Sequence, residues 1–513
     1  MAAWSEGYVA DIPYALGFYR ETVPAHLALA ALSVGRHPGS VASPRRVLEL
    51  GIGMGLNSVL AAASNPATQF EGIDFNPLHI AHARGLAEAA DLSNISLLEA
   101  SFQDLAAVAQ EGQHDLDLIV LHGILSWVSA EAHEAILTIV RRRLKPGGLL
   151  YVSYNCMPGW APFLPMQRLM REVGKRNSGR SDKSVGAAID LAQALAKEGA
   201  LYFAANTGLA QRLERMASMD RGYLPHEYLN ANWHIFHFAD VAEMFGRAKL
   251  DFVSSATLVE NADGLALPAG ARTRIEAEAD PIFKETLRDL ASNKQFRRDL
   301  FGRGTGALTG QEQSALIAGT RFTLAVPRAK VTFTFPTLMG DLSGKAELYG
   351  PIADRLAQGP ASFSEIAALP VFQAGGAGTV LQALTLLVHG GQVLPLPATP
   401  TMDFAPAQRL NSVLAEKMSQ GRTYNFLAAP LAGSGVQATN LELLMLSALR
   451  AGTRETADTM SAALTERMQP LGLAFLTDGK PETEPRVIRA RTEGEAHGFL
   501  TEKLPLWRQL GVI

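Results

Sequence analysis

Short apolar runs alternate with helical stretches between Arg45 and Asn155. Because the apolar runs are continuous, the pattern is typical of a parallel sheet with both faces covered by helices. The predicted strands are Val47–Leu50, Phe70–Asp74, Ile95–Glu99, Leu116–Leu121 and Leu149–Tyr154. The predicted helices are Leu56–Ser64, Pro77–Ala90, Leu105–Gln110 and Ala130–Leu144. With right-handed crossovers, these elements predict a doubly wound α/β domain.

After the fifth strand, helical periodicity dominates. Met166–Arg176 and Val185–Ala196 are predicted helices. A helix over Ala239–Ala248 then leads into a strand over Leu250–Leu258, and we expect this pair to return to the sheet. Residues Arg176–His237 would therefore form a helical cap inserted over the α/β domain.

The last part of the chain predicts a smaller unit. Thr320–Val326 and Lys330–Phe335 alternate like a β-hairpin. The elements beyond it follow the order of a winged helix: Ala346–Ala357, Ser362–Ala368, Gly378–Val388 and Gln392–Leu396. A helix that reads DNA would carry basic residues, yet no Lys or Arg lies between Leu356 and Leu396, so a packing role is favoured. We expect domains at residues 1–175, 176–340 and 341–513.

Composition narrows the functional class. The chain has 513 residues, 47% of them hydrophobic and 19% charged, which is typical of folded globular proteins. A net charge of −4 disfavours a broad nucleic-acid surface. Cys156 is the only cysteine, so neither a disulfide framework nor a thiolate metal cluster is expected. No signal peptide and no apolar run of about 20 residues is evident, which favours a cytoplasmic enzyme without membrane insertion.

The segment around the first predicted strand carries the main chemical signal. Glu49 ends the strand, and Gly51, Gly53 and Gly55 follow it with the spacing G-x-G-x-G. A dinucleotide fingerprint would need a third glycine at position 56, where Leu56 stands instead. On its own, this spacing also fits a tight strand-to-helix turn with no ligand.

Acidic residues on both sides of the glycine loop favour a cationic ligand. Glu49 would repel a pyrophosphate, but it suits the ammonium and sulfonium groups of S-adenosylmethionine. Asp74 ends the second strand about 20 residues later, at the position where a carboxylate commonly holds ribose hydroxyls. The sequence therefore predicts S-adenosylmethionine as the cofactor.

Longer motifs resemble one family of methyltransferases. They are His122–Val128 after the fourth strand, Tyr151–Asn155 with Pro158–Trp160 at the fifth, and Tyr223–Leu229 followed by Trp233. They resemble the class I S-adenosylmethionine-dependent methyltransferases with a methyltransferase regulatory domain. The best-known members are rickettsial protein lysine methyltransferases that modify outer-membrane proteins. The resemblance implies a Rossmann-like domain, a regulatory segment and a winged-helix-like C-terminal region.

The loop and the resemblance together give a set of expected cofactor contacts. These are Glu49, Gly51, Gly53, Gly55, Asp74, Phe75, Ser101, Phe102, His122 and Gly123. Two positions depart from the family pattern. Ser101 replaces the usual acidic residue that would face the adenine amino group, and Leu125 replaces the usual aromatic residue. The second change puts an identical substrate choice in doubt.

Candidate catalytic residues lie where the strands end, because a ligand crevice forms there in such sheets. We expect Tyr154 and Asn155 to face the acceptor, with His122 nearby and Trp127 or Trp160 as an aromatic wall. The alternative for the tryptophans is simple packing.

The cap segment contributes two further candidates. His226 and Glu227 would reach the acceptor, or else make structural hydrogen bonds that hold the cap. No metal is expected, because His226, His234 and His237 match no standard ligand spacing.

Residues outside these motifs raise further possibilities. Tyr8, Tyr14 and Tyr19 close over the cofactor or only pack. Arg297 and Arg298 are expected to be solvated, or to guide an acidic partner.

Three functional classes follow from these residues. The first is a protein lysine methyltransferase, for which an open cleft would be expected. The second is a methyltransferase of a small molecule or peptide metabolite, enclosed by the cap. The third is a non-catalytic regulator that binds the cofactor, which the intact glycine loop does not favour.

Overall fold

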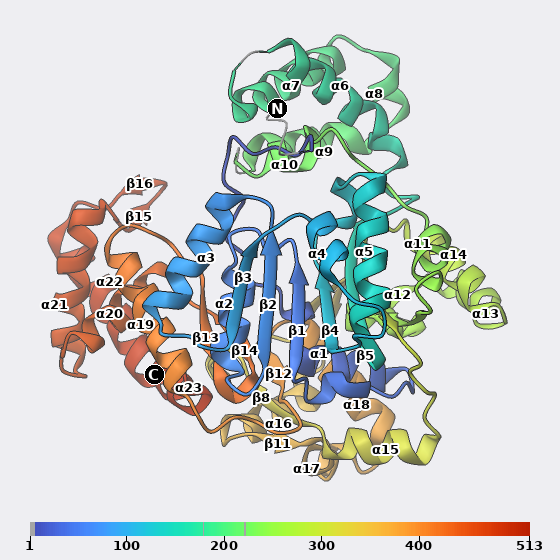
Figure 1. Cartoon of the computed structure of the whole chain (residues 1–513). Coiled ribbons are helices and arrows are strands. Elements are labelled where there is room, and N and C mark those ends of the chain that lie inside the picture. Colours follow the sequence, from blue (N-terminus) through green and yellow to red (C-terminus); the bar gives the residue numbers. More distant parts are fainter. Residues whose placement is uncertain (1–5, 178, 220–221) are drawn as a thin grey trace.

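The computed structural model describes residues 6–177, 179–219 and 222–513. Its centre is a seven-stranded sheet with the order β3-β2-β1-β4-β5-β7-β6 (Figure 1). The strands are β1 Arg46–Leu50, β2 Gln69–Asp74, β3 Ile95–Glu99, β4 Leu116–Leu121, β5 Leu144–Asn155, β6 Asp251–Ser255 and β7 Phe296–Gly302. The first five are mutually parallel, and β7 runs antiparallel to both β5 and β6.

Helices cover both faces of this sheet, as the apolar pattern predicts. One face packs on α4 Phe102–Val108, α5 Ala130–Arg143 and α11 Phe238–Gly246. The other face packs on α1 Pro24–Ser33, α2 Leu56–Ser64 and α3 Pro77–Ala89. The expected doubly wound α/β fold is confirmed, and the strand after α11 returns to the sheet as expected. The sequence analysis missed β7, which separates that returning strand from β5.

A helical cap lies over the carboxyl ends of the parallel strands (Figure 1). It consists of α6 Leu164–Arg176, α7 Ser181–Lys197, α8 Leu201–Ala205, α9 Gly208–Ser218 and α10 Leu224–Tyr228. These helices have an apolar core of their own, built around Met170, Ile189 and Leu213. Beyond the cap, α12 Asp263–Ala266, α13 Ala269–Glu276 and α14 Pro281–Ser292 lead into β7.

The predicted hairpin at residues 320–335 is wrong. β8 Arg321–Leu324 pairs with β11 Ala361–Ser362 and β12 Val393–Pro395, whereas β9 Thr334–Thr337 pairs with β10 Gly340–Ser343. The next helices are α15 Gly310–Gly319, α16 Ala346–Ala357, α17 Phe363–Ala367 and α18 Gly376–His389. The partners of β8 lie far along the chain, so local pattern could not identify them, whereas β9 forms its hairpin with the next strand rather than with β8. The winged-helix assignment is not confirmed, and the domain limits stay a prediction.

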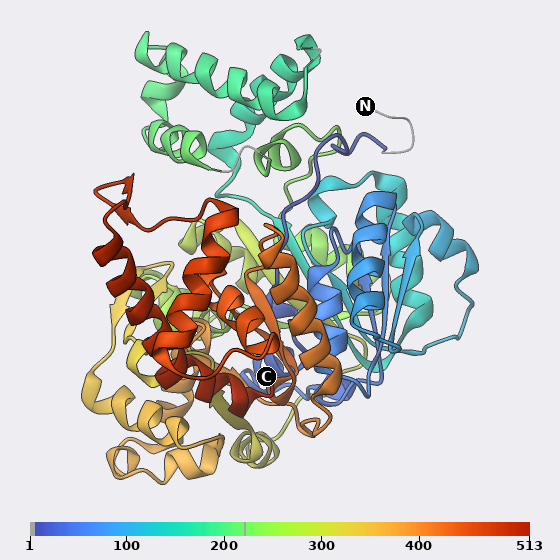
Figure 2. The ribbon, with the colours of Figure 1, turned by 90° about the vertical axis from the view of Figure 1, so that its left-hand side faces the viewer.

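The C-terminal region packs on the α/β domain beside α2 and α3 (Figure 2). Its elements are α19 Ala405–Ser419, β13 Phe426–Ala429, β14 Ser434–Gln437, α20 Asn440–Arg450, α21 Ala457–Met468, β15 Leu476–Thr477, β16 Lys480–Pro481, α22 Pro485–Gly498 and α23 Leu504–Leu510. Ser64 Oγ donates to the Ser434 carbonyl at 2.8 Å, and one apolar cluster spans both regions. In the part of the chain that is described, no helix is both long and apolar enough to cross a bilayer.

Candidate functional site

The loop between β1 and α2 needs its glycines. Gly51, Gly53 and Gly55 have φ angles of 75°, 54° and 75°, in the left-handed region. A Cβ on Gly51 would lie 2.3 Å from Ile124 Cδ1, and one on Gly55 would lie 2.4 Å from Ala83 Cβ. The loop therefore packs closely against its neighbours while Gly51 and Gly53 line a pocket.

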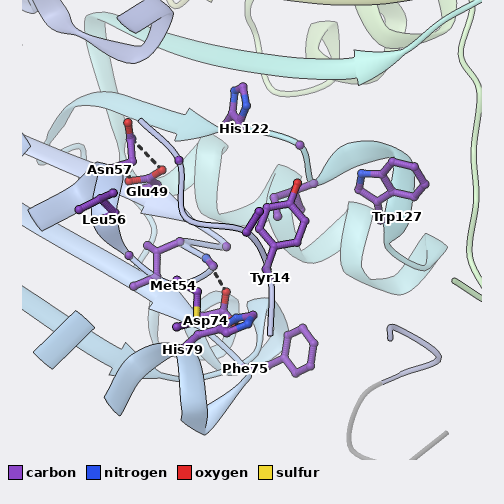
Figure 3. A pocket seen from close by; sticks show the side chains of 18 of the residues that line it. Tyr14, Glu49, Met54, Leu56, Asn57, Asp74, Phe75, His79, His122 and Trp127 are labelled. Atoms are coloured by element: carbon purple, nitrogen blue, oxygen red, sulfur yellow. Dashed lines mark hydrogen bonds and ion pairs between the residues drawn. The ribbon is translucent and has the colours of Figure 1, made fainter. Parts of the chain in front are cut away.

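Glu49 lies at one end of this pocket (Figure 3). Its carboxylate accepts hydrogen bonds from Asn57 Nδ2 at 3.0 Å and from the Ser58 hydroxyl, both at the start of α2. Burial raises the pKa of Glu49 to about 7, because these neutral donors offset only part of the desolvation. A cationic group beside Glu49 would stabilise its charged form.

Asp74 lies at a separate end of the same pocket (Figure 3). It accepts hydrogen bonds from the Gly53 amide at 2.9 Å, the Asn76 amide at 2.9 Å and His79 Nδ1 at 3.1 Å. The carboxylate therefore braces the glycine loop against the start of α3. It also borders the adjoining space lined by Phe75, Ser101 and Phe102.

Ser101 is the N-terminal cap residue of α4. Its hydroxyl accepts from the Asp104 amide at 3.1 Å, and its own amide donates to Asp104 Oδ2 at 3.0 Å, which forms a capping box. The hydroxyl therefore has a structural function, and its contact with the adenine stays a prediction. The aromatic rings of Phe75 and Phe102 line both spaces and suit a flat base.

Residues 6–19, here called the N-terminal strap, close the pocket from the cap side. Tyr8, Tyr14 and Tyr19 of the strap line the pocket. The strap is fixed to the segment after α10, since the Val9 amide donates to Asn230 Oδ1 at 2.9 Å and the Ala231 amide to the Gly7 carbonyl at 2.8 Å. These bonds connect the cofactor pocket to the cap.

His226 belongs to this fixation. Its ring lies 5.5 Å from Tyr8 and 5.1 Å from Tyr14, measured between centroids, and only 2% of the residue is exposed. Burial lowers the pKa of His226 to about 4, which keeps the imidazole neutral at physiological pH. His226 is not among the residues that line this pocket or the wider space beside it, because the strap tyrosines cover the ring, so its contact with the acceptor stays a prediction.

His122 and Gly123 follow β4 at the junction of two spaces. His122 stacks on Tyr19 with centroids 3.7 Å apart, and its Nδ1 lies 2.9 Å from the Tyr151 hydroxyl. Burial and the nearby Arg298 charge lower the pKa of His122 to about 3. The Gly123 amide donates to Ser153 Oγ at 2.8 Å, so β5 sets the course of this loop.

The charge of the pocket fits a cation better than a phosphate. Two carboxylates, Glu49 and Asp74, line it, and its described lining includes neither lysine nor arginine. A pyrophosphate would meet carboxylates with no compensating guanidinium or ammonium. The side chains present therefore suit the ammonium and sulfonium of S-adenosylmethionine.

A second, wider space adjoins this pocket under the cap; we call it the acceptor cavity. It encloses about 980 Å³. Five residues line both spaces: Tyr14, Tyr19, His122, Gly123 and Trp127. Asn155, Trp160, Phe163, Tyr223, Glu227 and Tyr228 also line the cavity. His122, Trp127, Asn155 and Glu227 are thus brought together, as the sequence analysis expects.

Glu227 contributes a carboxylate to the acceptor cavity. Its carboxyl is hydrogen-bonded to the Tyr223 hydroxyl, while burial raises the pKa of Glu227 to about 7. The Arg212 charge only partly opposes this rise. Glu227 can therefore gain or lose a proton close to neutral pH.

Tyr154 does not face the acceptor cavity, contrary to expectation. Side chains alternate along β5, so Tyr154 points to the α5 and α11 face, whereas Asn155 points to the cavity. The Tyr154 hydroxyl donates to Asp299 Oδ2 at 2.6 Å, and the side chain is 1% exposed. The sequence analysis placed both residues at the strand end without resolving which face each one occupies.

Arg297 is likewise not solvated as expected. It is 4% exposed and forms ion pairs with Glu285 at 2.8 Å, Asp289 at 2.6 Å and Asp299 at 2.8 Å. Its neighbour Arg298 projects to the opposite face of β7 and lines the acceptor cavity. Arg212 and Arg215 of the cavity were also missed, because they belong to no motif and lie on the cap helix α9.

Comparisons with known proteins agree with this geometry. Residues 47–148 match the family described as "Methyltransferase domain", and residues 220–303 match "Predicted methyltransferase regulatory domain". An uncharacterized protein of Synechocystis sp. is 33% identical over 518 residues, which cover 99% of each chain. The trans-aconitate 2-methyltransferase of Acidovorax sp. is 28% identical over 212 residues, covering 41% of this chain and 72% of that enzyme.

A solved structure shares the fold over the whole length. PKMT2 from Rickettsia typhi in complex with AdoHcy superposes with a TM-score of 0.73. The match covers 97% of this chain and 100% of that one, at 20% sequence identity.

Proposed function

The chain belongs to the class I S-adenosylmethionine-dependent methyltransferases with a regulatory domain, and on that premise we propose that it methylates lysine side chains of a protein. S-adenosylmethionine supplies an electrophilic methyl group on a good leaving group, so the protein's tasks are alignment, desolvation and delivery of a neutral amine. Glu49, the glycine loop and Asp74 would hold the cofactor, with Phe75 and Phe102 beside its base.

One observation carries the proposal: the acceptor cavity adjoins the cofactor pocket through shared lining residues and has aromatic walls with a single carboxylate. Tyr14, Tyr19 and Trp127 belong to both spaces, so an amine entering the cavity passes along ring faces toward the cofactor. Such walls accommodate the chain end of a lysine, and they favour its loss of charge once water is excluded. The likeness to PKMT2 of Rickettsia typhi supports the same substrate class.

Glu227 is the proposed proton acceptor. A lysine ammonium with a pKa of about 10.4 must lose a proton before its nitrogen attacks the methyl group. Because the pKa of Glu227 is raised to about 7, its carboxylate can take that proton and release it to solvent near neutral pH. Asn155 and the neutral imidazole of His122 would orient the amine.

Methylation of a small acid is the second candidate. The cavity includes Arg212, Arg215 and Arg298, and the relative from Acidovorax sp. is named for an acidic small molecule. An enclosed carboxylic acid would satisfy these guanidinium groups directly.

The test uses the full chain, S-adenosylmethionine labelled on the methyl group, and a lysate of its host. We expect label in protein, recovered as methylated lysine after hydrolysis. Glu227→Gln should lower kcat by about 10–100-fold, the usual contribution of a general base, while cofactor affinity changes less than about twofold.

The matched control is Glu214→Gln on the exposed surface of the cap helix α9, which should leave kcat unchanged. Label confined to small solutes would replace the proposal with the second candidate. An unaltered kcat in Glu227→Gln would remove this residue from the mechanism.

A further inference from the structure

The charges that line the acceptor cavity are unbalanced. Its described lining contains three arginines, Arg212, Arg215 and Arg298, against the single carboxylate of Glu227. That carboxylate is already bonded to the Tyr223 hydroxyl. The wall thus offers several charged donors and few acceptors.

Arg298 forms the floor of this cavity and has no carboxylate partner within ion-pair distance among the residues described. Its Nε is buried without a hydrogen-bond acceptor, and Nη1 makes only a long contact of 3.4 Å to Thr257 Oγ1. The adjacent Arg297 shows the contrast, since three carboxylates surround it on the other face of β7. The nearest counter-charge is Glu21: although burial alone would raise it, the charges of His26, Arg298 and Arg20 lower the pKa of Glu21 to about 2. Glu21 forms its ion pair with Arg20, so Arg298 has no carboxylate bonded to it, and its buried Nε is costly unless a ligand supplies an acceptor.

Arg212 and Arg215 add positive charge from the roof of the cavity, on α9. Arg212 is held by aromatic faces, with Cζ 4.1 Å from the Trp160 ring centroid and 4.2 Å from that of Phe163. In the described ranges, neither arginine forms an ion pair. The Arg212 guanidinium also bonds to the Tyr228 side chain and its charge acts on Glu227, so it adds positive charge to the roof of the cavity while its ring contacts fix its position.

Two neutral donors in the wall show the same deficit of acceptors. Asn155 is 4% exposed and Trp160 is 6% exposed, and both line the cavity. Asn155 Nδ2 and Trp160 Nε1 are buried without a hydrogen-bond partner. Buried donors of this kind are normally satisfied, so a ligand with oxygen acceptors would complete the site.

We propose that the methyl acceptor carries a carboxylate close to its nucleophilic atom, and that this carboxylate pairs with Arg298 under the roof formed by Arg212. Resting on the proposed function, this inference specifies a target lysine flanked by an acidic residue. The arginines disfavour an ammonium in their midst, so the same charges promote arrival of the lysine as a neutral amine.

The experiment compares short acetylated peptides that differ only beside one central lysine, which is followed by Glu in one set and by Gln in the other. Methyl transfer from labelled S-adenosylmethionine gives kcat/KM for each set. We expect the Glu peptides to exceed the Gln peptides by about tenfold, as charge-assisted hydrogen bonds are about twice as strong as neutral ones. Arg298→Gln should reduce this ratio to near one, and Arg298→Lys should restore part of it.

The matched control is Arg45→Gln, an exposed arginine before β1 at the opposite end of the sheet, which should keep the ratio of the wild type. Equal kcat/KM for Glu and Gln peptides in the wild type would overturn the inference, even though methylation of both would uphold the proposed function.

A second arm uses di- and tricarboxylic acids as acceptors, together with calorimetry of both peptide sets in the presence of S-adenosylhomocysteine. Transfer to the acids alone, dependent on Arg298, would defeat the lysine proposal but support the acidic acceptor. No transfer to any probe, with equal binding of both peptide sets, would overturn the inference as well.

Discussion

The cofactor pocket and the acceptor cavity share a wall but differ in how their polar groups are satisfied. In the pocket, Asp74 accepts three hydrogen bonds and Glu49 is bonded to two side chains of α2. In the cavity, Arg298 and Asn155 have donors without acceptors. The pocket is therefore organised before its ligand binds, whereas the cavity depends on its substrate to complete the hydrogen bonding.

The origin of each space in the chain explains this difference. The pocket is built mainly from strand-to-helix turns. Two short stretches of the chain, residues 49–57 and 74–79, contribute many of its lining residues. The cavity combines the strap, two strand ends, two cap helices and β7. Local sequence determines the first space, while long-range topology assembles the second, so the second can differ between relatives that share a cofactor.

Asp74→Ala should have the largest effect on this comparison. It removes a charged acceptor of three hydrogen bonds to the glycine loop and the start of α3. Hydrogen bonds to charged groups contribute roughly 1.5–3 kcal/mol each, so we expect cofactor affinity to fall by at least about 100-fold while the fold is retained. Calorimetry with S-adenosylhomocysteine measures the affinity, and circular dichroism checks the fold.

The control for this change is Asp341→Ala on the exposed strand β10, which should bind the cofactor normally. Undiminished affinity in Asp74→Ala would mean that the glycine loop holds the ligand without its carboxylate brace.

Two tyrosines of β5, Tyr151 and Tyr154, point to opposite faces of the sheet. Tyr154→Phe removes the bond to Asp299, which remains paired with Arg297. We expect a loss of about 2 kcal/mol in the free energy of unfolding, with turnover almost unchanged. Tyr151→Phe removes the bond to His122 and should instead lower turnover. Urea denaturation and methyl-transfer rates measure the two effects, and a fall in kcat for Tyr154→Phe alone would contradict this assignment.

The cofactor pocket could be predicted from the sequence, whereas the charged residues around the cavity could not. The glycine spacing and the acidic residues at strand ends were sufficient to predict the cofactor, because those residues are neighbours in the chain. The burial of Arg297 was not predictable, since its partners lie on α14 and farther along β7 itself. Nor did any motif indicate Arg212, which depends on the cap folding back over β5.

The missed strand β7 had the widest consequences for the site. Its sequence Phe296–Gly302 includes two adjacent arginines and an aspartate, which masks the apolar pattern of a buried strand. Only an antiparallel strand inserted between β5 and β6 places one arginine in an ion network and the other in the acceptor cavity. The charge of that cavity therefore became visible only in three dimensions.

The pH dependence of cofactor binding should report on Glu49. The pKa of Glu49 is raised to about 7 without a ligand, and an adjacent cation would lower it, so binding releases a proton. Affinity should therefore be highest above pH 7 and decrease as the pH falls, by about tenfold between pH 8 and pH 6. Calorimetry in buffers of different ionisation enthalpy measures both affinity and proton release. Glu49→Gln should flatten the profile, and a wild-type affinity that rises on acidification would reverse the proposed charge pairing.

The smallest expected effect concerns the connection between the C-terminal region and the cofactor pocket. His82 on α3 contacts the Met54 carbonyl of the glycine loop at 2.7 Å through Nδ1 and the Tyr424 hydroxyl at 2.9 Å through Nε2. Tyr424→Phe should weaken cofactor affinity by about threefold, the equivalent of one partly exposed neutral hydrogen bond. The ratio between Glu and Gln peptides should stay unchanged, because the cavity does not use this contact. In a double-mutant cycle with His82→Ala, Tyr424→Phe should add nothing; additive losses would mean that Tyr424 acts on the pocket by another route.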